Sequence, residues 1–399
     1  MKILHTADWH LGLSLGAEKR FEEYDALLNH FCSIIKKENI DVVIIAGDVF
    51  DSHIPPNRAA EQYYRFLVQA GRAGVREIIV IGGNHDSAAY LEAPREILKY
   101  LSVHVFASVT DNFRDMIVEL KDANGNLAAL IGAVPYLHER DLVIVEGGQG
   151  LVERETALRN AVLEYYQKMA DALTDISPDV PHILTGHLFA VDDKKKNDSW
   201  TGTLMSIAAD EFPESIDYLA LGHLHDRHTL KSTHPHKTCI RYPGAPLNVS
   251  FRELAVPKSV TVIDTDDMKY IREISLPSFQ DMRILEGSKA EIETTLVQWT
   301  KENKSIWCSI ENTGEYEPGL AENLYEFIKG SQVRIISCRN RSANPAVIQR
   351  LPEDRHLAEL APADVFKLLL KESGITGEDA GQLLAAFNEI ETATREDEK

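Results

Sequence analysis

Five short polar segments of this chain carry side chains that divalent metal ions bind, and each segment follows an apolar run. The segments are Asp8-Trp9-His10, Gly47-Asp48, Gly83-Asn84-His85-Asp86, Gly186-His187 and Gly222-His223-Leu224-His225. Seven of their residues offer suitable ligand atoms, namely Asp8, His10, Asp48, Asn84, His187, His223 and His225. Two cations about 3.5–4 Å apart can stabilise both the attacking and the leaving oxygen of a phosphoryl displacement. This mixture of carboxylate, imidazole and amide groups therefore predicts a two-metal phosphoesterase.

Each segment taken alone has a simpler explanation. Asp8 and His10 are two residues apart, and side chains at that spacing face the same way in extended backbone, so both could reach one cation. Asp48 follows a glycine after an apolar run, and its carboxylate could bridge two cations. An aspartate that caps a turn would give the same pattern, and a lone histidine is more often a hydrogen-bonded residue than a ligand. The prediction depends on all five segments meeting at one edge of a sheet.

The segment Gly83-Asn84-His85-Asp86 also contains the best candidates for catalysis. His85 could donate a proton to the leaving oxygen, and Asp86 could orient the imidazole of His85. The alternative is a glycine turn with polar residues, which are common in turns. His223 and His225 lie on either side of a leucine, and they could serve two adjacent cations.

The elements that must position these residues alternate between apolar strands and helices over residues 1–280. The predicted strands cover residues 2–6, 41–46, 76–81, 182–185, 218–221, 237–242 and 259–264, and the last two are expected to form a closing antiparallel section. The predicted helices cover residues 22–38, 59–71 and 154–173. Continuous apolar strands such as 41–46 indicate a sheet that is covered on both faces. Chemistry is expected at the carboxyl ends of such strands.

The character of the sequence changes near residue 280. Residues 281–345 predict a βαβαβ unit, with strands at 282–285, 305–311 and 332–339 and helices at 289–301 and 320–329. Residues 346–399 predict a polar linker and two helices with an apolar stripe formed by Val365, Phe366, Leu369, Leu370, Leu384 and Phe387. We therefore predict three parts, at 1–280, 281–345 and 346–399.

The composition is that of a globular protein with an acidic surface. The chain has 399 residues, of which 44% are hydrophobic and 26% charged, and its net charge is −20. No apolar run approaches the ~20 residues of a membrane-spanning helix, and no signal peptide begins the chain, so we expect a cytoplasmic protein without membrane contact. The four cysteines lack CxxC spacing and are expected to be reduced thiols. The acidic balance is unusual for an enzyme of nucleic acids, although bound cations can offset the local field.

Together the five segments resemble the calcineurin-like metallophosphoesterases. The fuller wording, His5-Thr6-Ala7-Asp8-Trp9-His10-Leu11-Gly12 and Gly47-Asp48-Val49-Phe50-Asp51, resembles their double-strand-break repair branch, the nuclease subunits of SbcCD-type complexes. The resemblance covers residues 1–280 well and the remainder mainly in layout. It implies an α/β fold: a four-layer metallophosphoesterase β-sandwich flanked by helices, with a small α/β cap domain and a helical C-terminal tail.

The resemblance also implies roles for single residues. One metal would be held by Asp8, His10, Asp48 and His225, and the other by Asp48, Asn84, His187 and His223. His85 would protonate the leaving oxygen or stabilise the transition state, with Asp86 supporting it. The cofactors would be two divalent ions, with Mn²⁺ as the family's preference and Mg²⁺ as the alternative. Asp51 stands where archaeal and eukaryotic relatives have a histidine, so a second catalytic histidine is not implied at this position.

Partners follow from the same resemblance. The cap at 281–345 would face double-stranded DNA ends and hairpins, and the C-terminal helices would bind the coiled-coil base of an SbcC-type ATPase. Two copies would form a homodimer, within a heterotetramer, through the helices at 59–71 and 93–101. Tyr63, Phe66 and Leu67 of the first of these helices could face either that second copy or the core. The alternative for the tail is that it folds back on its own domain.

Two other functions fit parts of the sequence. A phosphomonoesterase or small-molecule phosphodiesterase of the same superfamily would need the same metal ligands. Protein phosphatases of that superfamily place Arg-Gly directly after the Gly-Asp-x-x-Asp motif, whereas here Asp51 is followed by Ser52-His53. A non-catalytic scaffold would have lost ligands, and all seven positions are filled. We therefore expect a metal-dependent DNA exonuclease or endonuclease of DNA repair and recombination that reads the DNA backbone rather than base sequence.

Overall fold

The computed structural model describes residues 1–142, 151–192, 206–232 and 238–340, together with Leu370, Leu383, Leu384 and Phe387. The chain divides into two compact units. The larger unit contains Met1–Ile284, Trp299–Ser309 and Gly330–Ser337, and the smaller includes Leu285–Gln298 and Ile310–Lys329. All the predicted metal ligands belong to the larger unit.

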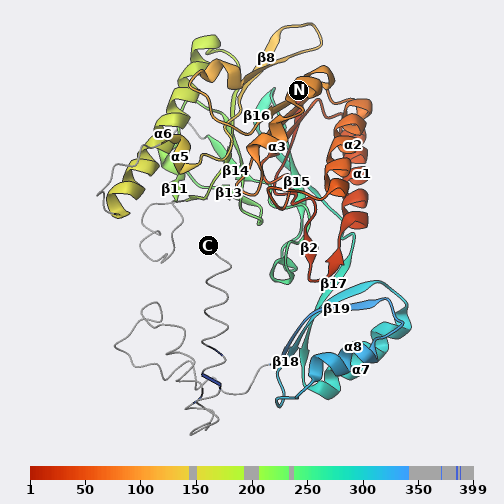
Figure 1. Ribbon diagram of the computed structural model, residues 1–399. Helices are drawn as coiled ribbons and strands as arrows, with labels where there is room; N and C mark the ends of the chain where they lie inside the picture. Colours follow the sequence, from red (N-terminus) through yellow and green to blue (C-terminus); the bar gives the residue numbers. More distant parts are fainter. Residues whose placement is uncertain are drawn as a thin grey trace. The chain divides into compact units, whose positions relative to one another are not determined.

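One six-stranded sheet of the larger unit is mostly parallel (Figure 1). Its strand order is β16 (Asp267–Ser275), β15 (Ser259–Asp264), β1 (Lys2–Thr6), β4 (Val42–Ala46), β5 (Glu77–Ile81) and β6 (Val103–Phe106). Strands β1, β4, β5 and β6 are parallel neighbours, whereas β15 pairs antiparallel with both β1 and β16. The carboxyl ends of β1, β4 and β5 therefore share one edge of this sheet.

A second six-stranded sheet has the order β13 (His228–Leu230), β14 (Cys239–Tyr242), β12 (Tyr218–Gly222), β9 (His182–His187), β8 (Leu127–Gly132) and β7 (Ile117–Lys121). Strands β14, β12, β9 and β8 are parallel, and the two edge strands are antiparallel to their neighbours. The register places Gly222 opposite His187, so the ends of β9 and β12 also lie together.

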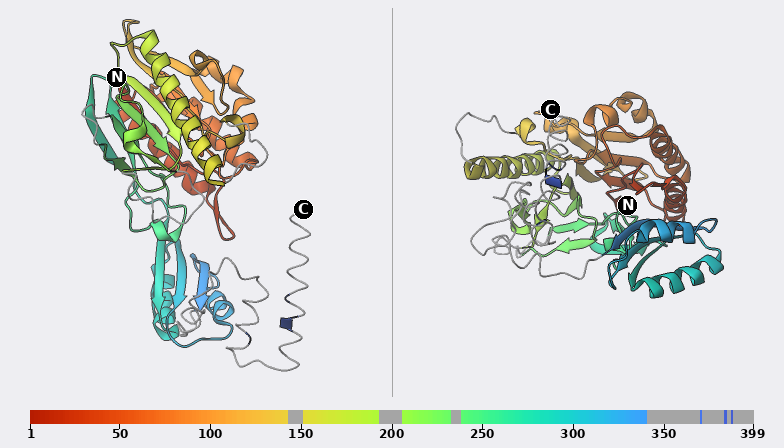
Figure 2. Two further views of the ribbon diagram at one scale, coloured as in Figure 1. Left: turned by 90° about the vertical axis from the view of Figure 1, so that its left-hand side faces the viewer. Right: turned by 60° about the horizontal axis from the view of Figure 1, so that its bottom comes forward.

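Helices cover the outer faces of both sheets, which gives four layers (Figures 1 and 2). Helices α1 (Phe21–Glu38) and α2 (Asn57–Ala73) lie beside the first sheet, and α6 (Leu151–Ile176) lies beside the second. Ile44 belongs to the core shared with the second sheet, while its neighbour Ile45 belongs to the core shared with α1 and α2. Side chains alternate between the faces of a strand, so a fully apolar strand fills two cores at once. The predicted four-layer fold is confirmed.

A buried hydrogen bond joins the two sheets below the predicted site. His5 Nδ1 on β1 lies 2.9 Å from the hydroxyl oxygen of Tyr218 on β12. Both side chains are fully buried, so the bond lies in a medium of low polarity, where it is stronger than in water. It joins β1 to β12 a few residues before the polar segment that follows each strand.

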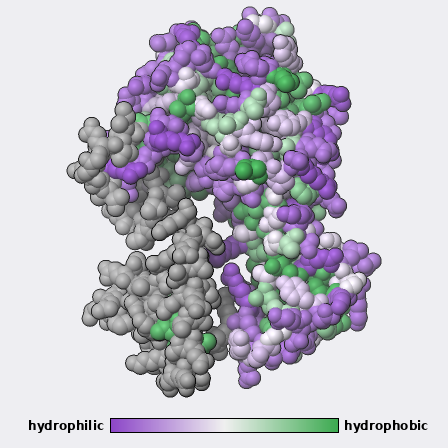
Figure 3. Space-filling view, viewed as in Figure 1, coloured by the Kyte–Doolittle hydropathy of each residue, from purple (hydrophilic) through white to green (hydrophobic). Residues whose placement is uncertain are grey.

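Shorter elements connect the layers. They are β2 (Ser14–Leu15), β3 (Glu18–Lys19), α3 (Ala88–Glu92), α4 (Arg95–Leu98), η1 (Lys99–Leu101), η2 (Phe113–Met116), α5 (Glu139–Leu142), β10 (Ala190–Val191), β11 (Ile207–Ala208), η4 (Ala209–Glu211) and η5 (Phe251–Glu253). Within the described ranges, no helix has both the length and the apolar character that crossing a membrane requires. The coloured part of the face drawn in Figure 3 is mainly hydrophilic.

The βαβαβ pattern predicted after residue 280 is present. It comprises β17 (Asp281–Gly287), α7 (Lys289–Glu302), β18 (Ile306–Asn312), α8 (Leu320–Phe327) and β19 (Val333–Asn340), and the strands form a sheet in the order β17-β18-β19. Apolar residues of each element are buried, among them Ile292, Leu296, Ile310 and Leu324. The boundaries at 280 and 345 stay predictions. The predicted linker and most of the tail lie outside the described residues.

Two expectations about packing need correction. Residues 237–242 and 259–264 do not form one antiparallel section, because β14 belongs to the second sheet and β15 to the first. Tyr63, Phe66 and Leu67 are core residues of α2, with at most 1% of their surface exposed, so they cannot supply a surface for a second copy. The most exposed apolar side chains of the two helices predicted for dimerisation lie on α4 and η1, where Ile97 is 71% and Tyr100 91% exposed.

Candidate metal centre

All seven predicted ligands lie at the carboxyl ends of strands from the two sheets. Asp8 and His10 follow β1, Asp48 follows β4, Asn84 follows β5, His187 ends β9, and His223 and His225 follow β12. Contacts cross from one sheet to the other, as where the amide of His223 donates to Asp8 Oδ1 at 2.8 Å. The seam between the two sheets therefore holds one cluster of ligand side chains.

The turns that carry these ligands use left-handed backbone. The φ angles are 53° at Asp8, 47° at His10, 48° at Asp48 and 100° at His223. The expectation that Asp8 and His10 converge because their backbone is extended is therefore wrong, since the chain converges by turning. Positive φ costs a non-glycine residue about 1–3 kcal/mol, and such strain persists where the surroundings fix it, as at functional sites.

Two glycines let the turns approach one another closely. A Cβ atom on Gly83 would collide with Asp48 Oδ1 and with the backbone nitrogen of Asp48. A Cβ atom on Gly222 would collide with the carbonyl oxygen of Ala46, which lies in the other sheet. Glycine is required at both positions because backbone atoms, which cannot rotate away, occupy the space.

One group of ligand atoms surrounds His10. His10 Nε2 lies 3.2 Å from His225 Nε2 and 3.7 Å from Asp48 Oδ2. The ligand atoms of Asp8, His10 and His225 all lie within 4.8 Å of one another. On the far side of the ring, His10 Nδ1 lies 3.4 Å from Asp51 Oδ1. The spacing of these atoms fits a single cation.

A second group surrounds His187. His187 Nε2 lies 3.2 Å from Asp48 Oδ2 and 3.1 Å from Asn84 Oδ1. His223 Nδ1 also lies 3.1 Å from Asn84 Oδ1. The Asp48 carboxylate thus faces both His10 and His187, as a ligand shared by two cations must.

Burial and unpaired polar atoms support a role in metal binding. Asp8, His10, Asp48 and His187 each have at most 3% of their surface exposed. Asp8 Oδ2 is buried without a hydrogen-bond partner, which costs free energy unless another group satisfies it. Oxygen and nitrogen ligands of this kind suit Mn²⁺ or Mg²⁺. The residues therefore fit a pair of divalent cations.

The electrostatic coupling in the cluster is strong. Burial raises the pKa of Asp8 to about 6, although the neighbouring imidazoles oppose this shift. Burial lowers the pKa of His187, but the Asp48 carboxylate outweighs that effect and raises it to about 9. Burial and the positive His187 together lower the pKa of His223 to about 4. Without cations, His187 therefore carries the positive charge that stabilises the buried Asp48.

The imidazole of His85 is exposed at the edge of the cluster, and its orienting partner is not the predicted one. His85 Nδ1 lies 3.0 Å from the carbonyl oxygen of Asp51. The carboxylate of Asp86 instead accepts hydrogen bonds from the backbone amides of Gly83, Val49 and Phe50. The predicted contact between Asp86 and the imidazole of His85 is therefore wrong. Asp86 ties the turn after β5 to the turn after β4, and this fixes the position of His85 indirectly.

The structure adds a residue that sequence reasoning missed. Glu253 in η5 places Oε1 3.2 Å from His225 Nδ1 and binds Lys258 through Oε2 at 2.7 Å. Burial opposes ionisation of Glu253, but the bonds to His225 and Lys258 lower its pKa to about 2. No motif marks Glu253, because it lies 28 residues beyond His225 in an irregular segment. Asp51 was visible in the sequence, yet its contact with His10 was not anticipated.

Three histidines outside the five segments have partners away from the candidate ligands, as expected. His104 Nε2 lies 2.8 Å from Glu77 Oε2 at the amino end of β5. The ring of His30 packs against Phe279, and His228 lies near Asp192. His53 is exposed, and His236 lies outside the described residues.

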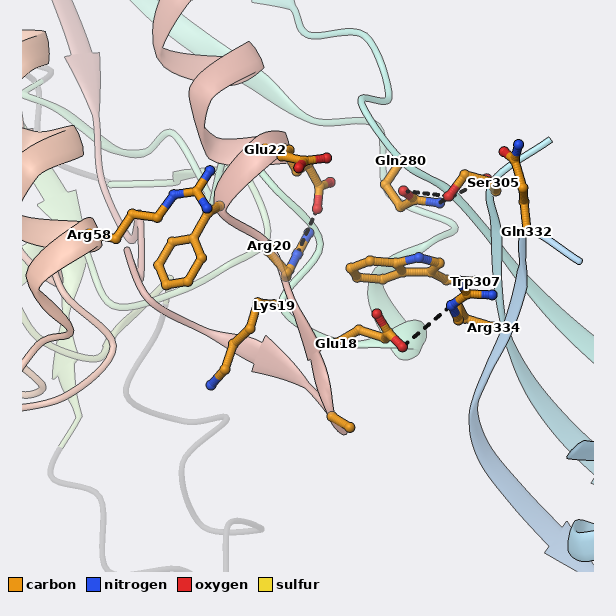
Figure 4. A pocket seen from close by; sticks show the side chains of 13 residues that line it. Glu18, Lys19, Arg20, Glu22, Arg58, Gln280, Ser305, Trp307, Gln332 and Arg334 are labelled. Carbon is orange, nitrogen blue, oxygen red and sulfur yellow. Dashed lines mark hydrogen bonds and ion pairs between the residues drawn. The ribbon is translucent and has the colours of Figure 1, made fainter. Parts of the chain in front are cut away.

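A polar cavity of about 560 Å³ lies elsewhere in the larger unit (Figure 4). Lys19, Arg20, Arg58 and Arg334 line it together with Trp307. Glutamates balance some of this charge, since Arg20 pairs with Glu23 at 2.7 Å and Arg334 with Glu18 at 3.6 Å. None of the seven candidate ligands lines this cavity.

Comparison with known proteins agrees with this geometry. Residues 1–227 match the model of the calcineurin-like phosphoesterase family, and residues 278–373 match the type 5 capsule protein repressor C-terminal domain. The chain is 32% identical to the D subunit of the SbcCD nuclease of Escherichia coli K12 over 385 residues, which covers 93% of this chain and 94% of that protein. It is also 32% identical to the corresponding SbcCD nuclease subunit of Bacillus subtilis over 272 residues, 66% of each chain. The chain therefore belongs to the calcineurin-like phosphoesterases, in the family of SbcCD nuclease D subunits.

Proposed function

We propose that this chain is the nuclease subunit of an SbcCD-type complex, which hydrolyses phosphodiester bonds at duplex DNA ends and hairpins in DNA repair and recombination. The observation that carries the proposal is the convergence of seven candidate ligand side chains from two sheets in one cluster, in which the Asp48 carboxylate faces both His10 and His187. A two-metal cluster of this kind is suited to in-line displacement at phosphorus. Family membership supports DNA rather than a small ester as the substrate.

The proposal assigns the two cation positions to separate groups of residues. Asp8, His10, Asp48 and His225 would hold one cation, and Asp48, Asn84, His187 and His223 the other. When bound, the cations supply Lewis acidity that polarises the phosphate and activates water. Mn²⁺ is the proposed ion, because imidazole and carboxylate occur together here and Mn²⁺ accepts both more readily than Mg²⁺ does.

His85 is the proposed proton donor to the leaving oxygen. The carbonyl oxygen of Asp51 can only accept, so the contact at 3.0 Å requires a proton on Nδ1 of His85. The ring orientation is thereby fixed, and the exposed Nε2 edge is free to meet a substrate. Asp86 supports this arrangement by bonding three backbone amides beneath the turn.

Domain roles and partners complete the proposal. Residues 1–280 would form the nuclease domain, 281–345 a DNA-facing cap, and 346–399 a linker with helices that bind an SbcC-type ATPase. Exposed Ile97, Tyr100 and Leu101 offer an apolar surface for a second copy, which would form the homodimer of a heterotetramer. The four cysteines, all among the described residues, form no disulfide, which supports the reducing cytoplasm as the proposed location of the protein.

Cleavage of end-labelled linear duplex and hairpin DNA tests the proposal. Mn²⁺ is expected to support cutting, EDTA to abolish it, and His85→Ala to remove most of it while the variant stays folded. A phosphomonoester and a cyclic dinucleotide should be run in parallel. Turnover of the small esters with DNA left intact, even with the ATPase partner present, would instead establish the alternative of a small-molecule phosphodiesterase or phosphomonoesterase.

A further inference from the structure

A carboxylate–histidine pair lies directly behind the candidate metal centre. Glu253 Oε1 accepts a hydrogen bond from Nδ1 of His225 at 3.2 Å. Glu253 and Lys258 are largely buried, with side-chain exposures of 13% and 9%. Histidines that bind metals commonly donate their second ring N–H to such a partner, which fixes the tautomer and the ring orientation.

The two oxygens of the Glu253 carboxylate have different hydrogen-bond partners. Oε2 accepts from Lys258 Nζ at 2.7 Å and from the backbone amide of Val249 at 3.2 Å. Lys258 Nζ also lies 3.4 Å from the carbonyl oxygen of His225. Glu253 is therefore held in place by Lys258 and Val249, and only its Oε1 is free to act on the imidazole.

This arrangement determines which nitrogen of His225 can bind a cation. A carboxylate can only accept, so the hydrogen bond requires the proton of the neutral ring on Nδ1. The lone pair is then left on Nε2, and that atom lies 3.2 Å from His10 Nε2 inside the cluster. His10 Nδ1 faces Asp51 Oδ1 at 3.4 Å without a hydrogen bond between them. The Nε2 atoms of both imidazoles thus point into one space, an arrangement that a cation between them stabilises.

We propose that Glu253, held in place by Lys258, is a positioning residue that keeps Nε2 of His225 unprotonated. Glu253 thereby sets the cation affinity of the position that His225 forms with Asp8, His10 and Asp48. This inference rests on the proposed function, because it assigns a role to Glu253 at the same site. It concerns metal binding by the resting protein and does not depend on the substrate.

Glu253→Gln is the sharpest test, because the donors around the side chain determine how a glutamine must lie. Lys258 and the amide of Val249 are both donors, so the amide oxygen of the glutamine must face them. Its NH₂ group must then face His225 Nδ1 and donate to it. The proton of the imidazole is forced onto Nε2, where it blocks the lone pair that a cation needs.

Mn²⁺ binding to the full-length, EDTA-treated protein, followed by calorimetry and electron paramagnetic resonance, gives a readout that is independent of cleavage. Wild-type protein is expected to bind two Mn²⁺, and Glu253→Gln to weaken one of them about 10–100-fold. Raising Mn²⁺ should restore cleavage by this variant. Glu77→Gln is the matched control, since Glu77 holds His104 at 2.8 Å far from the cluster, and the His104 and His225 side chains are each 30% exposed; it should leave both affinities unchanged.

A second variant and a measurement on wild-type protein test the same role of Glu253 if Glu253→Gln does not fold. Glu253→Asp keeps a negative charge beside Lys258 but withdraws the oxygen from His225, so it should fold and still bind one Mn²⁺ weakly. In wild-type protein, ¹⁵N-histidine NMR should find the proton of His225 on Nδ1. Wild-type affinity for both ions in Glu253→Gln, or a bare Nδ1 in the wild type, would overturn the inference. Two-site Mn²⁺ binding without DNA cleavage would refute the proposed function alone.

Discussion

The two proposed cation positions share Asp48, but they differ in what stands behind their histidines. In one position, His10 Nδ1 faces Asp51 and His225 Nδ1 faces Glu253, so a carboxylate supports each ring. In the other, His187 Nδ1 faces the carbonyl oxygen of Ala46 at 2.9 Å, which is a neutral dipole, and Asp8 Oδ1 is farther away at 3.9 Å. An anionic partner makes an imidazole a stronger donor to a cation than a neutral partner does. We therefore expect the His10 and His225 position to fill first, at lower Mn²⁺ concentration.

The largest effect should come from the residue that the two positions share. Asp48→Ala removes a ligand from both cations, so neither position should keep appreciable Mn²⁺ affinity. Metal ions contribute several kcal/mol to the stabilisation of the transition state, so cleavage should fall by at least about 10³-fold. Calorimetric titration and DNA cleavage measure the two losses. Retention of one tight Mn²⁺ site in this variant would show that Asp48 does not bridge.

Single-position variants should separate the two sites. His225→Ala should abolish the tighter Mn²⁺ binding event and His223→Ala the weaker one, because the two histidines serve different groups of ligands. Isothermal titration of both variants against wild type tests this assignment. The comparison between the positions fails if the two variants lose the same binding event.

The pH dependence of Mn²⁺ binding should reveal the protonated His187. Its pKa near 9 in the metal-free protein means that Mn²⁺ must displace a proton from it at pH 7.5. Affinity for that ion should therefore rise by up to about tenfold per pH unit and level off above pH 9. Calorimetric titrations in buffers of different ionisation enthalpy measure the number of protons that are released when Mn²⁺ binds. Identical affinities at pH 7 and pH 9 would contradict a protonated His187.

Raising the pH should strengthen Mn²⁺ binding at His187 but should lower the folding stability of the metal-free protein. A histidine whose pKa is raised from 6.5 to about 9 on folding contributes stability that is fully present below pH 6.5 and is lost as pH rises through 9. The melting temperature of EDTA-treated protein should therefore fall between pH 6.5 and pH 9. A His187→Ala variant should show a smaller decrease over the same range in differential scanning calorimetry.

The smallest effect should come from Lys258. Lys258→Met leaves Glu253 in place and still bonded to the amide of Val249 at 3.2 Å, so His225 should keep its tautomer. Mn²⁺ affinity should decrease only about 2–5-fold, which corresponds to about 0.5–1 kcal/mol. A loss as large as that of Glu253→Gln would mean that Lys258 acts through more than the placement of Glu253.

Some features were predictable from the sequence because they follow from local pattern. Apolar runs that end in polar turns identified strands β1, β4, β5, β9 and β12, and with them the seven ligand candidates. The pairing of strands that are distant in the sequence was not predictable, since the alternation of apolar strands and helices does not reveal which sheet a strand joins. This is why β14 and β15 were grouped together, and why Glu253 was not found behind His225.

Side-chain partners were also hidden from the sequence. Asp86 appeared to be a partner of His85, but three backbone amides nearby satisfy its carboxylate instead. The apolar side chains of α2 could have faced either side, and only the packing against α1 and the first sheet shows that Tyr63 is core. Both errors arise from contacts that depend on the folded backbone rather than on spacing.

The contact between His10 and His225 joins residues 215 positions apart. A ribosome adds residues from the amino end, so a nascent chain contains the ligands Asp8, His10, Asp48 and Asn84 long before His187, His223 and His225 are made. No intermediate shorter than 225 residues can assemble both proposed cation positions. The proposed metal centre can thus be completed only after more than half of the chain has been synthesised.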